Sequence, residues 1–268
     1  MHKVLVFTDL HILPEGETLI GLDPAARFAQ ALAHALDNHR DAARIVITGD
    51  LTHNGAPAEY ARLRTLLSRC PIPVSLMLGN HDRRAAFSAA FPSMPRTSSG
   101  HCQQMHDLKG HRLILLDTLD EDAPDRHSGW LSPGRMRWLD NALLGAGDRL
   151  ITVFTHHPPI DCGFPAMDRI GLRNRDALTD RLRAHGRTAH IISGHIHRSI
   201  SGNAGGLPVT IFKSPCHQAP MMLTGNDVHL SIDEPGAYGI LLLTPSGVIV
   251  HSQDVGLPAT RPQSYAPR

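Results

Sequence analysis

Residues 188–197 read TAHIISGHIH, a mostly apolar run followed by a glycine and two histidines one residue apart. A short apolar run that ends at a glycine is typical of a buried β-strand. His195 and His197 follow this strand directly. They are either ligands of a metal ion, for which histidine is the commonest residue, or polar residues on a solvated strand end. The residues at the ends of the other strands distinguish these alternatives.

Further predicted strands alternate with helices over the first two-thirds of the chain. Strands are expected at 4–7, 44–48, 74–78, 111–118, 149–156 and 188–197, and helices at 25–36, 57–68, 83–91, 132–144 and 176–185. Asp23 and Ser132, each followed by proline, have the residue types that begin a helix. This order predicts a layered α/β core. Later strands, at 209–213, 238–244 and 248–252, have no predicted helix between them.

Side chains that could bind metal follow the predicted strands at their carboxyl ends. They are Asp9, His11, Asp50, Asn80, His81, His156, His195 and His197. The chain has 19 histidines. If they were distributed by composition alone, they would not be concentrated at the ends of the strands. Because the ligand site of an open α/β sheet lies beyond the carboxyl ends of its strands, we expect the five segments to meet at one edge of the sheet.

The spacing within these segments also suits a shared cavity. Asp9 and His11 are separated by one position, as are His195 and His197, and on an extended chain such side chains point to the same side. Three glycines precede candidate ligands: Gly49, Gly79 and Gly194. A glycine at such a place permits a sharp turn and a close approach of the backbone.

The candidate ligand atoms are nitrogen and oxygen without thiolate, a mixture that favours Zn, Mn, Fe or Co. They are too many for one tetrahedral ion. Two ions that share a bridging carboxylate fit better, and Asp50, which stands alone after its strand, is the natural bridge. Two metals about 3.5–4 Å apart can clamp a phosphoryl group and generate hydroxide at neutral pH.

Five motifs, in this order, resemble those of the calcineurin-like metallophosphoesterase superfamily: DLH at 9–11, GD at 49–50, GNHD at 79–82, HH at 156–157 and GHIH at 194–197. The resemblance covers residues 1–255 by order and spacing. Within the superfamily, the chain is similar to the bacterial cyclic-nucleotide and glycerophosphodiester phosphodiesterase branch, with the bacterial glycerophosphodiesterases nearest. The stretches that indicate this branch are GETLIGLDPAARF at 16–28, GDLTHNGAPAEY at 49–60, HHPP at 156–159, AMD at 166–168 and CHQAP at 216–220.

The resemblance implies a fold and a role for each motif residue. The fold is a four-layer α/β/β/α sandwich, two mixed sheets flanked by helices, in which the late strands would supply the second sheet. One divalent ion would bind Asp9, His11, Asp50 and His197, and the second would bind Asp50, Asn80, His156 and His195. His81 would be the catalytic residue that faces the phosphate and protonates or stabilises the leaving oxygen, and His217 would contact the substrate.

The implied activity is that of a dinuclear phosphodiesterase, which hydrolyses small phosphodiesters such as glycerophosphodiesters by attack of a metal-bound hydroxide. A cyclic-nucleotide phosphodiesterase, for cAMP or cGMP, and a phosphomonoesterase are alternatives. An alternative from another class is a catalytically silent metal-binding scaffold. No metal residue and no GNHD histidine is missing from the sequence, which disfavours the scaffold.

The expected organisation is a catalytic domain over 1–256 and a tail or arm over 257–268. The segment at about 216–236 would form a cap or a dimer interface, as relatives use one to narrow the cavity. Its alternative is an ordinary excursion between two strands. We expect a homo-oligomer, a dimer or higher.

The roles of three residues in or near the motifs are predicted separately. Position 53 is His where many relatives carry Asp or Asn, and we expect His53 to be an exposed loop residue. Asp82 is expected to cap the helix that follows it rather than to orient His81. His157 is expected to be structural rather than a ligand.

Composition restricts the remaining partners. The net charge is +1, so no basic field indicates nucleic acid as a partner. No segment approaches the ~20 apolar residues of a membrane span. The N-terminus runs directly into a strand without the features of a signal peptide, so we expect a cytoplasmic protein. The four cysteines form no C-x-x-C pair, and we expect them to be reduced.

Overall fold

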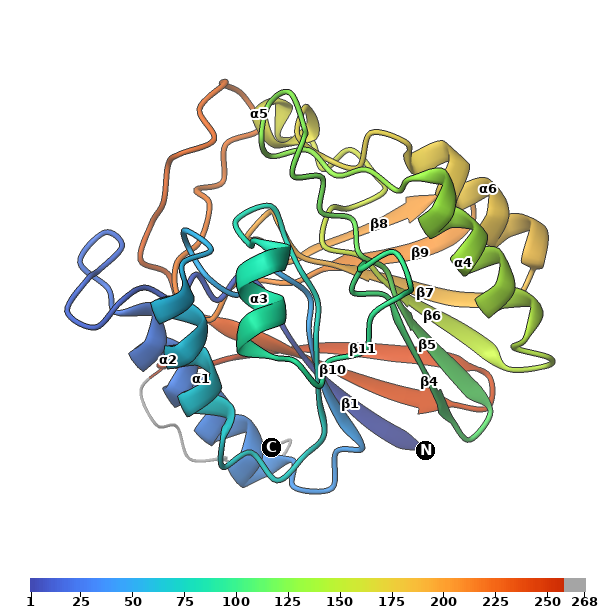
Figure 1. The fold of residues 1–268 in the computed structure, drawn as a ribbon, viewed down its shortest axis with the longest axis horizontal. Coiled ribbons are helices and arrows are strands. Elements are labelled where there is room, and N and C mark those ends of the chain that lie inside the picture. The colour runs from blue at the N-terminus through green and yellow to red at the C-terminus, as the bar shows by residue number, and fades with distance from the viewer. Residues whose placement is uncertain (258–268) are drawn as a thin grey trace, which may run out of the picture.

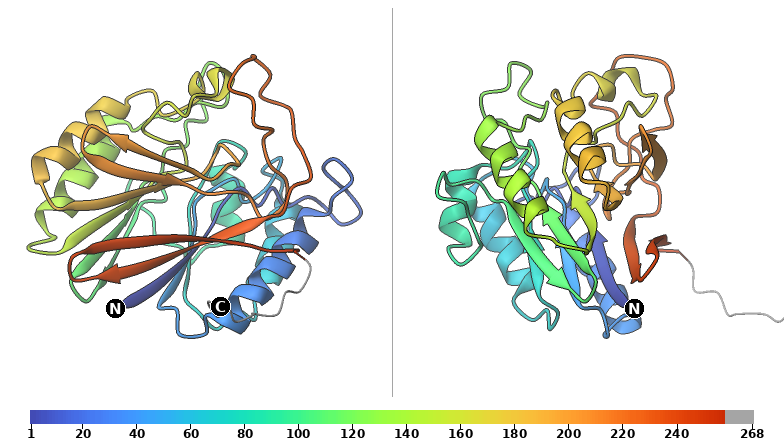
Figure 2. Two further views of the ribbon diagram at one scale, coloured as in Figure 1. Left: turned by 180° about the vertical axis from the view of Figure 1, so that it is seen from behind. Right: turned by 90° about the vertical axis from the view of Figure 1, so that its right-hand side faces the viewer.

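In this computed structural model, which describes residues 1–257, two mixed β-sheets lie face to face with helices on their outer surfaces (Figures 1 and 2). The first sheet has the order β11-β10-β1-β2-β3 and contains β1 (His2–Phe7), β2 (Arg44–Ile47), β3 (Val74–Leu76), β10 (Ala237–Thr244) and β11 (Gly247–Asp254). The second has the order β4-β5-β6-β7-β9-β8 and contains β4 (Gln104–Leu108), β5 (His111–Leu115), β6 (Leu150–Phe154), β7 (Thr188–Ser193), β8 (Ile200–Ala204) and β9 (Leu207–Ile211). The helices are α1 (Pro24–Asn38), α2 (Pro57–Leu67), α3 (Arg84–Ala90), α4 (Pro133–Leu144), α5 (Pro165–Asp168) and α6 (Arg175–His185).

Alternation along the strands divides the apolar side chains between three layers of core. Leu5 and Phe7 of β1 belong to the core beneath the helices of the first sheet, where the ring of Phe7 meets that of Phe28 at 5.5 Å. Val4 and Val6 point the other way, into the core between the sheets. The second sheet divides its side chains in the same manner. The predicted four-layer α/β/β/α sandwich is confirmed.

Two helices begin at the predicted capping residues. The side chain of Asp23 accepts a hydrogen bond from Ala25 N at the start of α1, and that of Ser132 accepts one from Arg135 N at the start of α4. Each satisfies a main-chain N–H that has no partner within the helix. These caps therefore fix the residues at which α1 and α4 begin.

Of the three predicted late strands, only the first, β9, joins the second sheet, so the prediction is wrong for the other two. β10 and β11 return to the first sheet, where β10 pairs antiparallel with β1, and only β8 and β9 join the second. The apolar pattern of a strand buried on both faces does not say which sheet it joins. Two edge strands, β4 and β8, are not predicted, because their sequences are of mixed polarity.

Three further expectations concern the chain as a whole. Within residues 1–257, no helix has the length and apolar character needed to cross a membrane. Apart from Leu257, the predicted tail 257–268 lies outside the described residues. All four cysteines are free, as expected: Cys70, Cys102, Cys162 and Cys216.

A hydrogen-bonded chain joins the two sheets where β3 and β4 meet. Arg44 Nη1 donates to Ser75 Oγ at 2.9 Å, and this oxygen lies 2.9 Å from His106 Nε2. Because the oxygen accepts from the guanidinium, its own hydrogen is available for a neutral His106. Burial, and then the charge of Arg44, lower the pKa of His106 to about 4.

We expect His106 to contribute to the loss of stability in acid. Its folded pKa lies below its ordinary value of 6.5, so the stabilisation is present above pH 6.5 and is lost as the pH falls towards 4. His106→Gln should therefore flatten the pH dependence of the free energy of unfolding, measured with urea between pH 7 and pH 4.5. His251→Gln, at an exposed position of β11, is the control, and identical slopes in all three proteins would contradict the assignment.

Candidate metal centre

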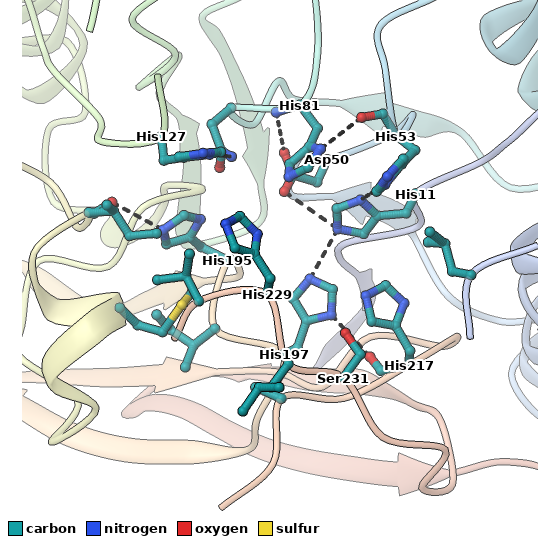
Figure 3. Close-up of a pocket in the computed structure, with 18 of the residues that line it drawn as sticks. His11, Asp50, His53, His81, His127, His195, His197, His217, His229 and Ser231 are labelled. Carbon is teal, nitrogen blue, oxygen red and sulfur yellow. Dashed lines mark hydrogen bonds and ion pairs between the residues drawn. The ribbon is translucent and has the colours of Figure 1, made fainter. Parts of the chain in front are cut away.

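Strand ends from both sheets converge on one cavity. β1, β2 and β3 belong to the first sheet and β6 and β7 to the second, so the prediction of one edge of one sheet is wrong. Face-to-face packing brings together the carboxyl ends of the parallel strands of both sheets. A cavity of about 400 Å³ lies there, and the nine site residues predicted from the sequence lie in or beside it (Figure 3).

The first group of predicted ligands is closely assembled. Asp9, His11, Asp50 and His197 each place one ligand atom within 4.8 Å of the others. His11 Nε2 lies 3.0 Å from His197 Nε2 and 3.6 Å from Asp50 Oδ2. His197 Nε2 lies 3.7 Å from Asp9 Oδ1. These are the four residues that the motif resemblance assigns to one ion.

The second group shares Asp50 with the first. Asp50 Oδ2 lies 3.4 Å from His156 Nε2, which is 3.2 Å from Asn80 Oδ1. The ring of His195 lies 5.1 Å from that of His156. The other carboxylate oxygen, Asp50 Oδ1, accepts a hydrogen bond from the main-chain N–H of His81 at 2.9 Å. One oxygen of Asp50 is thus anchored, and the other faces both groups.

Main-chain carbonyls determine which nitrogen three of the histidines offer. The bonds run from His156 Nδ1 to Thr48 O at 3.1 Å, from His197 Nδ1 to His217 O at 3.0 Å and from His195 Nε2 to Ile170 O at 3.1 Å. A carbonyl oxygen only accepts, so the bonded nitrogen carries the hydrogen and the other offers a lone pair. Metal-bound histidines are held in this way.

When these rings are neutral, acceptor atoms therefore converge with no donor between them. The amide nitrogen of Asn80 donates to His127 Nδ1 at 3.2 Å, which turns Asn80 Oδ1 towards His156 Nε2. With Asp50 Oδ2, three atoms that offer lone pairs meet in a buried place. Buried acceptors are unfavourable unless a positive charge lies among them. The residues present therefore fit a divalent cation with nitrogen and oxygen ligands.

The pKa values in the cluster reflect the same demand for positive charge. Burial would raise the pKa of Asp50, but His156, His81 and His11 outweigh it and hold that pKa well below its ordinary value. Burial would lower the pKa of His156, but Asp50 outweighs it and raises that pKa to about 9. A cation that replaces the proton of His156 would make metal binding release protons.

The predicted ligands lie in strained turns beyond the strands. Five of them have left-handed backbone, with φ of 53° at Asp9, 47° at His11, 47° at Asp50, 72° at His195 and 55° at His197. This conformation costs roughly 1–2 kcal/mol per non-glycine residue, and such outliers gather at functional sites. The expectation that the paired ligands lie on extended chain is wrong, because β1 ends at Phe7 and β7 at Ser193.

The two other predicted site residues border the same cavity. His81 Nδ1 donates to His53 O at 2.7 Å, and its Nε2 has no hydrogen-bond partner among residues 1–257. The ring of His217 lies 4.6 Å from that of His197. Its Nδ1 is buried and likewise has no partner in the described part of the chain. Figure 3 shows both rings at the cavity with His11 between them.

Two further histidines support the ligands without joining them. His157 Nε2 donates to His127 O at 2.9 Å, and its Nδ1 lies 2.8 Å from the hydroxyl of Thr118. Both nitrogens are therefore occupied, and His157 is structural, as expected. His127, which orients the amide of Asn80, follows no predicted strand, so no sequence signal identified it.

His53 is not the exposed loop residue that the sequence analysis predicts. His53 N donates to Ile12 O at 3.1 Å, which draws the loop along the segment that carries His11. As a result, His53 is half-buried, its Nδ1 lies 3.3 Å from His11 Nδ1, and its ring stacks on His81 at 5.2 Å. His11 is thus the ligand candidate whose second nitrogen meets an imidazole.

Asp82 does not cap α3, for which Arg83 is the N-cap residue. Its buried carboxylate accepts hydrogen bonds from Leu51 N at 3.1 Å, from Gly79 N at 2.9 Å and from Tyr60 OH at 2.9 Å. The prediction of a cap is wrong because these donors bring the side chain inward. Asp82 thereby ties the turn that carries Asp50 to the turn that carries Asn80.

Gly79 allows these two turns to approach, and this gives a test of the site. A Cβ atom at residue 79 would lie 2.2 Å from Asp50 Oδ1, so Gly79→Ala must displace the shared carboxylate. We expect the affinity for divalent metal to fall roughly 10–100-fold, measured by calorimetric titration. Gly134→Ala in α4, where a Cβ meets nothing closer than 3.8 Å, is the matched control. Equal affinities in the two variants would contradict this assignment.

Comparisons with known proteins agree with the motifs. A family model described as calcineurin-like phosphoesterase matches residues 2–199. The chain is 36% identical, over 93% of its length and 91% of the relative, to a probable cyclic nucleotide phosphodiesterase of Rhodopseudomonas palustris. It is 30% identical to the 3′,5′-cyclic adenosine monophosphate phosphodiesterase of Pseudomonas aeruginosa, over 79% of this chain and 75% of that one. It is 29% identical to a glycerophosphodiester phosphodiesterase of Enterobacter lignolyticus, over 79% and 78%.

The fold is also found in solved structures. A dimetal phosphatase from Danio rerio superimposes with a TM-score of 0.72 over 94% of this chain and 96% of that one, at 15% identity. At this identity the likeness concerns the fold alone. The family match covers more than half of the chain, and the relatives carry the names of the predicted branch. The chain therefore belongs to the calcineurin-like phosphoesterase family, as its strand-end motifs predict.

Proposed function

We propose that this chain is a dinuclear metal-dependent phosphodiesterase that hydrolyses small phosphodiesters. The observation that carries the proposal is the position of Asp50 Oδ2, which faces His11 Nε2 at 3.6 Å and His156 Nε2 at 3.4 Å. Membership of the family makes the chain a hydrolase of phosphate esters. The names of the relatives support phosphodiesters as its substrates.

The ligand atoms divide into two sets that share one carboxylate. Asp9, His11, Asp50 and His197 would hold one ion, and Asp50, Asn80, His156 and His195 the other. The mixed nitrogen and oxygen donors suit Fe, Mn, Zn or Co. When bound, two such ions supply positive charge to a phosphate group and lower the pKa of water.

His81 is the residue of this chain best placed to act on the leaving oxygen. Its Nδ1 hydrogen is held by His53 O, so its Nε2 is the nitrogen available to a substrate. In the neutral ring Nε2 accepts a hydrogen bond, and only the imidazolium form can donate from it. A protonated His81 would donate to the leaving alkoxide as charge develops. The buried His217 would contact the substrate from the opposite side of His11.

The walls of the cavity favour a second, narrower candidate, the hydrolysis of cyclic nucleotides. Apart from Asp50, none of the side chains that line the cavity is aspartate, glutamate, lysine or arginine among residues 1–257. The apolar lining residues are Leu19, Ile20, Met167, Ile170, Ile196, Ala219, Val228 and Leu230. A neutral, flat base can bury its faces against such walls, whereas an ammonium head group finds no acidic partner beyond the metal centre.

The position of the segment 216–236 supports its predicted role as a cap. Figure 1 shows it, in orange, projecting beyond the same end of the sheets as the loop after β1, in blue. Arg198 anchors its two ends, because Nη1 donates to Ala219 O at 2.9 Å and to Glu234 at 2.7 Å. Exposed apolar side chains on it are Met221, Leu223 and Leu230. Such exposure supports its use as the interface of a homo-oligomer.

The cytoplasmic location of the protein stays a prediction.

Turnover of a phosphodiester tests the proposed activity. Protein reconstituted separately with Mn, Zn, Fe and Co should hydrolyse bis(p-nitrophenyl) phosphate with at least one of these metals. His81→Asn should lower kcat by roughly 10²–10⁴-fold while two ions stay bound, because the proton donor is lost and the ligands are intact. Release of p-nitrophenolate and metal analysis of the same samples measure both quantities.

His251→Asn, on the exposed face of β11, is the control for this experiment and should keep full activity. A metal-loaded wild-type protein without turnover would overturn the proposal in favour of the silent scaffold. Faster hydrolysis of p-nitrophenyl phosphate than of the diester would instead indicate a phosphomonoesterase.

The two histidines of GHIH should belong to different ions. His197 lies with His11 and Asp9, and His195 lies with His156. His197→Ala and His195→Ala should therefore each lose a different one of the two ions, which anomalous scattering from crystals of the two variants locates. Loss of the same ion first in both variants would refute this division.

A further inference from the structure

An unusual turn carries Ile20 to the mouth of the cavity. Leu19 and Leu22 exchange two main-chain hydrogen bonds, of 2.9 and 2.8 Å, around the central residues Ile20 and Gly21. Both central residues have positive φ, 47° and 82°. Turns of this kind favour Asn-Gly at the centre, because asparagine tolerates the left-handed conformation. A β-branched residue there is a genuine outlier.

Helix α2 holds the ends of the loop that carries this turn. Arg62 of α2 donates to the carbonyl of Leu13 at 2.9 Å and to the carboxylate of Asp23 at 2.9 Å, so one side chain holds both ends of the loop. Besides Ile20, the non-glycine residues with positive φ are the five metal-ligand candidates and Arg126, within residues 1–257. Strain that the structure maintains is a sign of function.

The side chain of Ile20 is exposed and apolar at a place where substrate would enter. Its exposed fraction is 53%, and it lines the cavity together with Leu19. A solvent-exposed isoleucine stabilises the free protein little, so relief of strain would favour another residue. Contact with a ligand is a reason to keep it.

We propose that Ile20 determines specificity by packing against the base of a nucleoside cyclic phosphate. The phosphate would lie at the metal centre, and the base would lie between Ile20 and the other apolar walls: Met167, Ile170, Val228 and Leu230. The cavity volume of about 400 Å³ lies in the range of small-ligand sites. This assignment rests on the proposed phosphodiesterase activity and names the residue that selects its substrate.

Ile20→Asn separates substrate contact from structural support. Asparagine suits the turn, so we expect the melting temperature to rise by roughly 2–4 °C. The apolar contact is lost, so kcat/KM for cyclic AMP should fall about tenfold. For the matched cyclic phosphate without a base, methyl ribofuranoside 3′,5′-cyclic phosphate, kcat/KM should stay within about twofold of wild type, because the base contact is absent.

Two further variants complete the test. Ile20→Leu keeps an apolar side chain, so its kcat/KM for cyclic AMP should stay close to the wild-type value. Leu144→Asn, at the exposed end of α4, controls for the loss of a surface apolar residue and should change neither rate. An unchanged kcat/KM for cyclic AMP in Ile20→Asn, or equal losses for the two substrates, would overturn the assignment.

The failure of this assignment can be told from failure of the proposed activity. If the wild type does not hydrolyse bis(p-nitrophenyl) phosphate, the proposed activity fails, and if it hydrolyses this diester but neither cyclic phosphate, only the narrower cyclic-nucleotide activity fails. In either case calorimetric binding of cyclic AMP to the metal-loaded proteins decides the role of Ile20. A tenfold weaker Kd for Ile20→Asn supports the contact. An equal Kd refutes it.

Discussion

The convergence of buried acceptor atoms around Asp50 is the constraint on which the rest of the molecule depends. His156 Nε2 and Asn80 Oδ1 face each other at 3.2 Å, and when the ring of His156 is neutral both atoms offer lone pairs. Such a group is stable only with positive charge inside it. Three kinds of surrounding contact hold these acceptor atoms in place. Carbonyl groups hold the outer nitrogens of the histidines, the N–H of His81 holds Asp50 Oδ1, and Asp82 ties the two turns together.

This constraint explains why strain is concentrated at the ends of regular strands. A strand directs successive side chains to opposite faces, so it cannot aim several ligands at a point beyond its own end. The left-handed turns after β1, β2 and β7 make that change of direction. Their combined cost of several kcal/mol is comparable with the net stability of a domain. The three apolar layers must offset this cost, and a bound metal would couple the folding of these turns to the occupancy of the site.

The sequence predicts the chemistry of the site better than its geometry. Asp9, Asp50 and His156 were identifiable because each follows an apolar run, and the position of such a residue is a local property. The sheet that each strand joins is not local: β10 is buried on both faces and pairs with β1 across more than 200 residues of chain. The roles of the supporting residues are not predicted, for the same reason: Asp82 and His53 receive other roles from the sequence, and His127 receives none. Asp82 and His127 act through partners distant in sequence, and His53 is brought inward by a main-chain bond to Ile12.

The division between rigid strand ends and long loops also separates catalysis from specificity. The candidate metal ligands project from turns anchored on two sheets, where glycines such as Gly194 leave no room for a larger residue: a Cβ there would lie 1.9 Å from Thr8 Oγ1. Most of the apolar wall residues come from the 13–23 loop, the α5 region and the 216–236 segment, which lie outside the strands. Loops of this kind generally tolerate substitution better than the elements that they connect. The names of the relatives include both cyclic nucleotide and glycerophosphodiester phosphodiesterases. Ile20 is a wall residue whose backbone is as strained as that of a ligand, and this combination distinguishes it from its apolar neighbours.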